Sequence, residues 1–281
     1  MIFLPNTIID PVIKRALAED LGDAGDITSE AVVAKEAKAS AEVVSRKVGT
    51  VAGLFVARRV YELLDPAIET KITSSDGSSC EQGDVLIKLQ GSARTILMGE
   101  RVALNFLGHM SGIATATAQI VASVSHTKAR VCCTRKTTPG LRAFEKYSVR
   151  MGGGINHRFG LHDGILIKDN HIAATRGIED AVKSAQSVAG HMVKIEVEVD
   201  SLDQLEEALT AGADVIMLDN MSTQLMRDAA QIVRGRAILE ASGSITTDTA
   251  PAIAELGIDV ISSGWITHSA PALDVGLDFL C

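Results

Sequence analysis

The stretch between residues 130 and 168 concentrates positive charge in an otherwise acidic chain. It holds eight lysine and arginine side chains and only two acidic ones, whereas the 281-residue chain carries a net charge of −8 at pH 7. The eight cations are Arg130, Arg135, Lys136, Arg142, Lys146, Arg150, Arg158 and Lys168. Arginine suits two-pronged contact with a carboxylate, and lysine suits point contact with a phosphate. We therefore expect a local cationic pocket for a small polyanionic substrate.

A solvated helix face is the alternative interpretation of these charges. It accounts for Lys146 and Arg150, which stand four residues apart beside Glu145 in a helical pattern. It accounts poorly for Arg135, Lys136 and Lys168, because each of these follows an apolar, strand-like run.

Two glycine- and serine-rich segments, residues 240–249 and 262–270, each follow a predicted strand and precede a helical pattern. Backbone N–H groups in such turns bind phosphate. Ordinary turn formation and helix capping are the alternative role of these residues.

Carboxylates stand at the ends of three predicted strands, namely Glu198, Asp219 and Glu240. Such groups can hold ribose hydroxyls, or Mg²⁺ through oxygen ligands. Neutralisation of Lys168 and Lys194 inside the protein explains the same spacing equally well.

The elements that position these groups are a series of apolar runs, each followed by a turn and a helical pattern. Such alternation predicts a parallel sheet, and with a seventh strand near 149–152 it predicts a full or partial α/β barrel. Active sites of that fold lie at the carboxyl ends of the strands. The six runs are 129–136, 164–169, 193–200, 214–220, 236–244 and 259–264.

The run 193–200 alternates strictly, with Ile195 and Val197 on one face and Glu196 and Glu198 on the other. In a barrel covered by helices, the charged face would point inward. An exposed edge strand with a solvated polar face is the alternative.

The chain before residue 112 has a mixed pattern. Helices are expected at 8–20, 55–64 and 92–108, a strand at 39–54, and short antiparallel strands at 69–91. Arg101 shares a helix face with Leu97 and Leu104, where a charge needs a partner. That partner is either a nearby acid such as Glu100 or an anion bound in this subunit or a neighbouring one.

Several functions are disfavoured by composition and by missing motifs. Bulk negative charge disfavours nucleic-acid binding, and no run reaches the roughly 18 apolar residues of a membrane span. The start of the chain lacks the features of a signal peptide, and Cys80, Cys132, Cys133 and Cys281 have no zinc spacing. We expect a cytoplasmic protein with free thiols, in which His171 has a structural or capping role.

Long strings of this sequence resemble the quinolinate phosphoribosyltransferase family. They are TRKTTPGLR (134–142), residues 145–172, LEASGSI (239–245) and ISSGWITHSAPALD (261–274), with further matches at 18–31 and 100–115. The resemblance implies an α/β protein with an N-terminal open α/β sandwich domain (1–112). It also implies an incomplete, seven-stranded TIM-like α/β barrel (113–269) and a C-terminal segment (270–281) packing back on the N-terminal domain.

The family resemblance implies an enzyme of NAD biosynthesis, a pentosyltransferase that joins quinolinate to phosphoribosyl pyrophosphate with loss of CO₂. It implies Mg²⁺ as cofactor, held directly or indirectly by Glu198 and Asp219, and at least a homodimer. Quinolinate would be bound by Arg135, Arg158, Lys168 and the Arg101 of a neighbouring subunit, with His157 close by. Lys136, Glu198 and Asp219 would act on phosphoribosyl pyrophosphate, and Ser242, Gly243, Ser244, Ser263 and Gly264 would hold its 5′-phosphate.

Two residues depart from the family pattern, which usually has glycine at Ser244 and alanine at Trp265. A serine at a position that needs a positive φ carries a cost, and Trp265 is bulky beside a phosphate loop. A related branch associated with molybdate transport changes the strings at 134–142 and 156–161, which this chain keeps. The alternatives are a catalytically divergent paralogue or phosphate-ligand binding protein on the same fold, and a Schiff-base aldolase built on Lys168 or Lys194.

Overall fold

The structure is a computed structural model that describes residues 4–280 and divides into two compact units. The first unit comprises Met1–Ala118, Thr138–Gly153 and Ser269–Cys281, and the second comprises Gln119–Thr137 and Gly154–His268. The chain therefore passes from one unit to the other more than once. The expected domain bounds of 1–112, 113–269 and 270–281 remain predictions.

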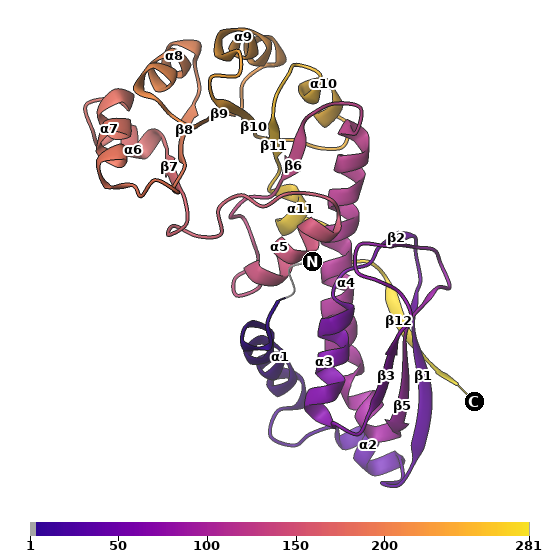
Figure 1. The fold of residues 1–281 in the computed structure, drawn as a ribbon. Coiled ribbons are helices and arrows are strands. Elements are labelled where there is room, and N and C mark those ends of the chain that lie inside the picture. The colour runs from indigo at the N-terminus through magenta and orange to yellow at the C-terminus, as the bar shows by residue number, and fades with distance from the viewer. Residues whose placement is uncertain (1–3, 281) are drawn as a thin grey trace. The chain divides into compact units, whose positions relative to one another are not determined.

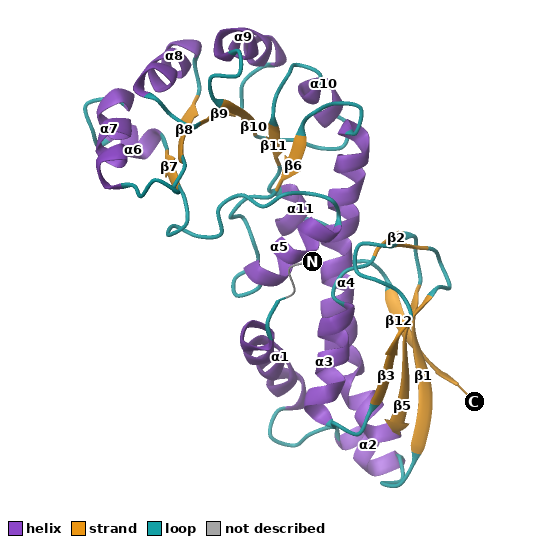
Figure 2. Ribbon diagram, in the orientation of Figure 1, coloured by secondary structure: helices purple, strands orange, loops and turns teal. Residues whose placement is uncertain are grey.

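The first unit combines helices with a four-stranded antiparallel sheet in the order β12-β1-β5-β3 (Figures 1 and 2). Its strands are β1 (Lys38–Ser45), β3 (Glu69–Ile72), β5 (Val85–Ser92) and β12 (Val275–Leu280), with β2 (Gly49–Thr50) and β4 (Ser79–Cys80) forming a separate pair. Its shorter helices are α1 (Asn6–Leu21), α2 (Ile27–Val32), α3 (Leu54–Leu64) and α5 (Arg142–Met151). Strand β12, from the far end of the sequence, pairs with β1.

The core of the first unit draws on residues that are distant in sequence. Tyr61 of α3 is fully buried, as is Ile13 of α1, and Phe144 of α5 stacks on Phe106 with ring centroids 5.6 Å apart. Helix α4 (Ala93–Val124) is much longer than the helix expected at 92–108. The apolar pattern simply continues, because Ile113 and Ile120 are also fully buried.

The second unit is built on a six-stranded parallel sheet in the order β6-β11-β10-β9-β8-β7. Helices α7, α8 and α9 pack on one side of it (Figure 2). The strands are β6 (Arg130–Cys132), β7 (Ile165–Ile167), β8 (Ile195–Val199), β9 (Val215–Asp219), β10 (Ile238–Ser242) and β11 (Val260–Ser262). The helices are α6 (Asp169–Ala173), α7 (Ile178–Val188), α8 (Leu202–Ala211), α9 (Thr223–Val233), α10 (Ala250–Ala254) and α11 (Trp265–His268). All six predicted strands are confirmed.

The seventh strand expected near 149–152 is wrong. Residues 142–151 form α5, and the chain turns at Gly152. The apolar residues there belong to an amphipathic helix whose buried side includes Phe144 and Val149. The only seventh contact in the described sheet is an isolated parallel bridge between Ile155 and Cys132.

Strand β8 pairs with β7 on one side and with β9 on the other. The edge-strand alternative is therefore wrong. In the same sheet, Ser242 of β10 is level with Asp219 of β9 and with Ser262 of β11. The carboxyl ends of these three strands thus meet at one edge of the sheet.

Two further sequence expectations concern cysteines and membranes. Cys80, Cys132 and Cys133 are buried and form no disulfide, whereas Cys281 lies outside the described residues. Within residues 4–280, no helix is both long enough and apolar enough to cross a bilayer.

Candidate active site

A cavity of about 280 Å³ lies where β8 and β9 end. Four carboxylates line it, those of Asp169, Glu198, Asp200 and Asp219. Lys168, which directly follows β7, forms an ion pair with Glu198. The structure therefore brings Lys168, Glu198 and Asp219 together, as parallel strands with aligned ends require. Because Glu198 engages Lys168 Nζ, the arrangement disfavours Lys168 as a Schiff-base nucleophile.

Arg135 and Arg158 are close enough to act on each other electrostatically. Partial burial, followed by the charge of Arg135, lowers the pKa of Arg158, while Glu196 and Asp163 oppose that shift. Arg158 Nη1 donates a hydrogen bond to the backbone carbonyl of Gly164 at 2.9 Å. Its Nε is buried and has no hydrogen-bond partner among the described residues. Two neighbouring guanidinium groups with an unused donor are suited to an anion.

Lys136 is fixed next to Gly264. The Lys136 carbonyl accepts a hydrogen bond from Thr267 Oγ1 at 2.7 Å, and its N–H donates to Thr134 Oγ1 at 3.0 Å. A Cβ atom added to Gly264 would lie only 2.9 Å from Lys136 Cδ. The stem of Lys136 thus occupies the space that any other residue at position 264 would need.

The two glycine- and serine-rich loops meet at the ends of β10 and β11. Buried Ser263 donates from Oγ to the carbonyl of Ile245 at 3.0 Å, which ties one loop to the other. Within the described chain, the backbone N–H groups of Gly243, Ser244 and Gly264 have no acceptor. These donors are the ones that a phosphate group would use.

Ser244 adopts a left-handed backbone conformation with a φ of 49°. A non-glycine residue pays roughly 1–2 kcal/mol for this conformation, so the cost expected for serine in this loop is present. Gly243 precedes it with a φ of 105°, and a Cβ there would lie 2.1 Å from Asn220 Oδ1. Asn220, which sequence reasoning missed, also has a positive φ of 52°. Its position directly after Asp219 was the only available signal.

His157 lies beside two buried acids, Glu196 of β8 and Glu240 of β10. Its Nε2 is 2.9 Å from Glu196 Oε2 and 3.9 Å from Glu240 Oε1. Burial and the charge of Glu196 raise the pKa of Glu240 to about 7. These residues and Arg158 line a cavity of about 240 Å³ that also contacts the first residues of β7, β9, β10 and β11.

The remaining cations of the 130–168 stretch are distributed differently from the expectation. Arg142, Lys146 and Arg150 lie on α5 in the first unit, whereas the other five cations lie in the second unit. The solvated-face interpretation is wrong for Lys146, which is buried. Neighbouring Glu145 is also buried, and it contacts His109 Nε2 at 3.0 Å and accepts from the Thr138 N–H.

Arg101 is exposed on α4, so it does not place a charge against the apolar core. No acid of residues 4–280 forms an ion pair with it, which removes the local-partner explanation. It lines a cavity of about 550 Å³ within the first unit, together with α1 residues such as Arg15 and Glu19. His171 accepts the Lys168 N–H through Nδ1 at 2.9 Å, so its predicted capping role is confirmed.

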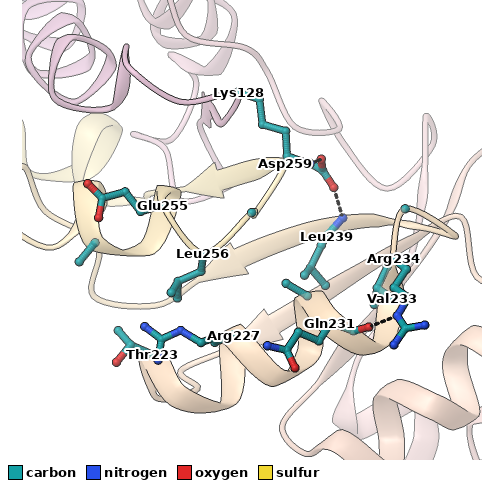
Figure 3. A pocket seen from close by; sticks show the side chains of 14 residues that line it. Lys128, Thr223, Arg227, Gln231, Val233, Arg234, Leu239, Glu255, Leu256 and Asp259 are labelled. Atoms are coloured by element: carbon teal, nitrogen blue, oxygen red, sulfur yellow. Dashed lines mark hydrogen bonds and ion pairs between the residues drawn. The ribbon is translucent and has the colours of Figure 1, made fainter.

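A larger cavity of about 670 Å³ lies between α9 and α10 (Figure 3). Lys128 pairs with Asp259 at 2.6 Å, and the Asp259 carboxylate also accepts the Leu239 N–H at 3.0 Å. Arg234 is bound to its own helix through the Gln231 carbonyl at 2.8 Å. None of the site residues predicted from sequence lines this cavity.

Taken together, the strand ends carry cations, carboxylates and two loops with unused N–H donors. In an α/β-sheet protein, this arrangement is suited to binding phosphorylated, anionic small molecules. Comparison with known families is more specific. Residues 26–111 match the N-terminal domain of quinolinate phosphoribosyl transferase, and residues 113–278 match its C-terminal domain. The chain belongs to the quinolinate phosphoribosyltransferase family.

Relatives and solved structures support this assignment over nearly the full length. The chain is 45% identical to the probable nicotinate-nucleotide pyrophosphorylase (carboxylating) of Bacillus subtilis, over 95% of this chain and 92% of that one. It is 41% identical to the corresponding Mycobacterium leprae protein, over 95% of each chain. The crystal structure of NadC from Streptococcus pyogenes superposes with a TM-score of 0.95 at 42% identity, covering 100% of both chains.

Gly264→Ala is expected to weaken binding of inorganic pyrophosphate about tenfold or more. The added methyl group displaces Lys136, and a lost charge-assisted contact costs roughly 1.5–3 kcal/mol. Titration calorimetry on the folded variant measures the effect. Gly190→Ala is the matched control, because no atom lies within 4 Å of the added Cβ. Unchanged pyrophosphate affinity in Gly264→Ala would contradict the role of this contact.

Glu240→Gln is expected to change how stability depends on pH. A carboxyl group with a pKa of about 7 in the native state and about 4.5 in the unfolded state makes the native protein bind more protons between these values. The wild type therefore loses stability as pH rises from about 4.5 to about 7. Glutamine cannot ionise, so the variant should gain stability relative to the wild type over this range. Urea unfolding at pH 5 and pH 8 tests this, and a constant difference would refute it.

Proposed function

We propose that this chain is a carboxylating nicotinate-nucleotide pyrophosphorylase, a pentosyltransferase of NAD biosynthesis. It would convert quinolinate and phosphoribosyl pyrophosphate into nicotinate mononucleotide, pyrophosphate and CO₂. The observation that supports this most is the pair Arg135 and Arg158, which share a region with an unused, buried guanidinium donor. An aromatic acid with two adjacent carboxylates has the charge and shape that two neighbouring guanidinium groups bind.

Quinolinate binding is assigned to Arg135, Arg158 and Lys168, with His157 beside Arg158. Lys168 is paired with Glu198, so an incoming carboxylate would compete for, or join, that ion pair. Holding the ring against the sugar converts a bimolecular encounter into a positioned one, which supplies several kcal/mol of the barrier.

Phosphoribosyl pyrophosphate is assigned to the strand ends next to this region. Its 5′-phosphate would accept from the unused N–H groups of the Gly243–Ser244 turn and of Gly264, with Ser242 and Ser263 supporting those turns. Lys136, beside Gly264, would balance the charge that builds on the departing pyrophosphate. Glu198 and Asp219 would stabilise the positive character of the sugar carbon.

The chemistry balances without an external oxidant or reductant. The ring nitrogen forms a bond to C1 of the ribose while the bond between C1 and the pyrophosphate oxygen breaks. The electron pair of the broken bond leaves with pyrophosphate. The ring nitrogen is then cationic. The C2–carboxylate bond breaks, CO₂ leaves, the cationic ring stabilises the electron pair left on C2, and C2 takes up a proton.

The strand-end cavity also fits Mg²⁺. Four carboxylates line it, and of the two assigned to the metal, Asp219 is engaged by the Asn220 amide and Glu198 by Lys168. Such an oxygen-rich set suits Mg²⁺, which typically takes one or two carboxylates plus substrate phosphates. Glu198 and Asp219 would hold the ion directly or through water. When bound, Mg²⁺ supplies charge stabilisation to the pyrophosphate leaving group.

We also propose that the enzyme acts as a homodimer or larger assembly in the cytoplasm. Arg101 is exposed and lacks a carboxylate partner among the described residues, which suits an arginine that serves a second copy. In this proposal, Arg101 of one copy completes the quinolinate site of the other. No nucleic acid or membrane has a role in this function.

Incubation with quinolinate, phosphoribosyl pyrophosphate and Mg²⁺ should yield nicotinate mononucleotide, with pyrophosphate and CO₂ released in equal amounts. Arg158→Ala should raise KM for quinolinate by about tenfold or more, because each lost charge-assisted contact costs roughly 1.5–3 kcal/mol. Arg130→Ala is the matched control, since Arg130 is an exposed cation of the same stretch, at the start of β6. Product analysis by mass spectrometry and steady-state kinetics measure both.

Three results would contradict the proposal. Turnover of nicotinate but not of quinolinate would show that quinolinate is not the substrate. Trapping of a substrate on a lysine by borohydride would favour an aldolase. Unchanged turnover after a chelator has removed divalent cations would contradict only the part of the proposal that concerns Mg²⁺.

Mixing two inactive variants tests the shared site. Arg101→Ala and Lys136→Ala should each lose most activity, and subunit exchange between them should restore up to about one quarter of wild-type activity. The restored hybrid has one site in which both residues are intact. Failure to restore activity, in hybrids whose formation mass spectrometry confirms, would contradict completion of the site by a second copy.

A further inference from the structure

The second unit contains a buried acid that the reaction above does not use. Glu196 of β8 has only 6% of its surface exposed, and its Oε1 has no hydrogen-bond partner among the described residues. Its other oxygen, Oε2, lies 2.9 Å from His157 Nε2. Burial of a carboxylate is costly unless its charge is balanced. The groups that Glu196 contacts therefore indicate its role.

The hydrogen bonds around His157 define which ring nitrogen carries the proton. The backbone N–H of Arg158 donates to His157 Nδ1 at 2.8 Å, so Nδ1 acts as an acceptor. In a neutral imidazole the other nitrogen, Nε2, is then the donor. Nε2–H accordingly donates to Glu196. The same assignment leaves no lone pair on Nε2, so the cluster of His157, Glu196 and Glu240 is not arranged to bind a metal ion.

The imidazole thus connects a barrel strand to the backbone of Arg158. Glu196 on β8 accepts from one end of the ring, and the Arg158 N–H donates to the other. The segment after Arg158 is fixed separately, because the Asp163 carboxylate accepts the N–H groups of Phe159 and Gly160 at 2.6 and 2.8 Å. Glu196, through His157, therefore fixes the backbone at Arg158, directly before the segment that Asp163 fixes.

Glu196 also acts on the guanidinium of Arg158 directly. Its charge favours the protonated guanidinium, against partial burial and the repulsion from Arg135. Burial and the charge of Glu196 raise the pKa of the neighbouring acid Glu240 to about 7, so Glu240 is only partly ionised near neutral pH. Of the acids that act on Arg158, Glu196 has the larger effect and Asp163 the smaller.

We propose that Glu196 is a positioning residue for the aromatic dicarboxylate, acting on Arg158 through the His157 ring and through its own charge. The proposal rests on the proposed function. Glu196 does not contact the substrate in this scheme, and neither phosphoribosyl pyrophosphate nor the chemical step depends on it. Its removal should therefore separate the two substrates kinetically.

Glu196→Gln is the first test, because glutamine keeps the size and one acceptor oxygen but removes the charge. We expect KM for quinolinate to rise about tenfold, with KM for phosphoribosyl pyrophosphate and kcat within twofold of the wild type. A purely structural role would lower kcat, or the fraction of active enzyme, without separating the two KM values. Glu255→Gln is the matched control, since Glu255 forms an exposed pair with His126 at 3.2 Å.

His157→Phe and the double variant test the pathway. Phenylalanine keeps a ring of similar shape but removes both hydrogen bonds, so KM for quinolinate should rise in the single variant. If Glu196 acts through His157, the double variant should show little further increase. An increase in His157→Phe combined with an unchanged Glu196→Gln would mean that His157 binds quinolinate itself, and would overturn the proposal.

The remaining outcomes are also distinguishable. Absence of turnover in the wild type would refute the proposed function, whereas wild-type turnover with unchanged quinolinate KM in Glu196→Gln would refute only this inference. If Glu196→Gln does not fold, Glu196→Asp replaces it, because the shorter side chain keeps the charge but withdraws from Nε2. An unchanged quinolinate KM in that variant would overturn the proposal as well.

Discussion

The site depends on a repulsion between two like charges. Arg135 and Arg158 lie within electrostatic range of each other, and Arg158 is partly withdrawn from water. A folded chain keeps such a pair only where negative charge compensates it. Glu196 and Asp163 supply part of that charge. In the proposed function a bound dianion would supply more, so that relief of the repulsion between the two arginines would contribute to its binding.

The second unit positions these groups by simple strand geometry. Parallel strands end at a common edge, so residues that follow β7, β8 and β9 gather there without any special local structure. Alternation along β8 places Glu196 and Glu198 on the same face of the strand, and Glu198 lies two residues nearer its carboxyl end. Strand β8 thus provides both Glu196, which contacts His157, and Glu198, which lines the strand-end cavity.

Much of this could be predicted from sequence because it depends on period and order. The six parallel strands, the inward charged face of β8 and the loop pair after β10 and β11 all follow from local patterns. The prediction of a seventh strand was wrong because a short run of residues inside an amphipathic helix resembles a short strand when it is considered alone. Burial of Lys146 and Glu145, and the contact between His157 and Glu196, could not be predicted, since they depend on segments that meet only after folding.

The pairing of β12 with β1 has a consequence for how the chain is made. Strand β1 emerges early in synthesis, whereas residues 275–280 emerge only after every strand of the second unit. Until then, one side of β1 presents unpaired backbone groups of the kind that recruit other strands. The four-stranded sheet of the first unit is therefore complete only after every strand of the second unit has been synthesised.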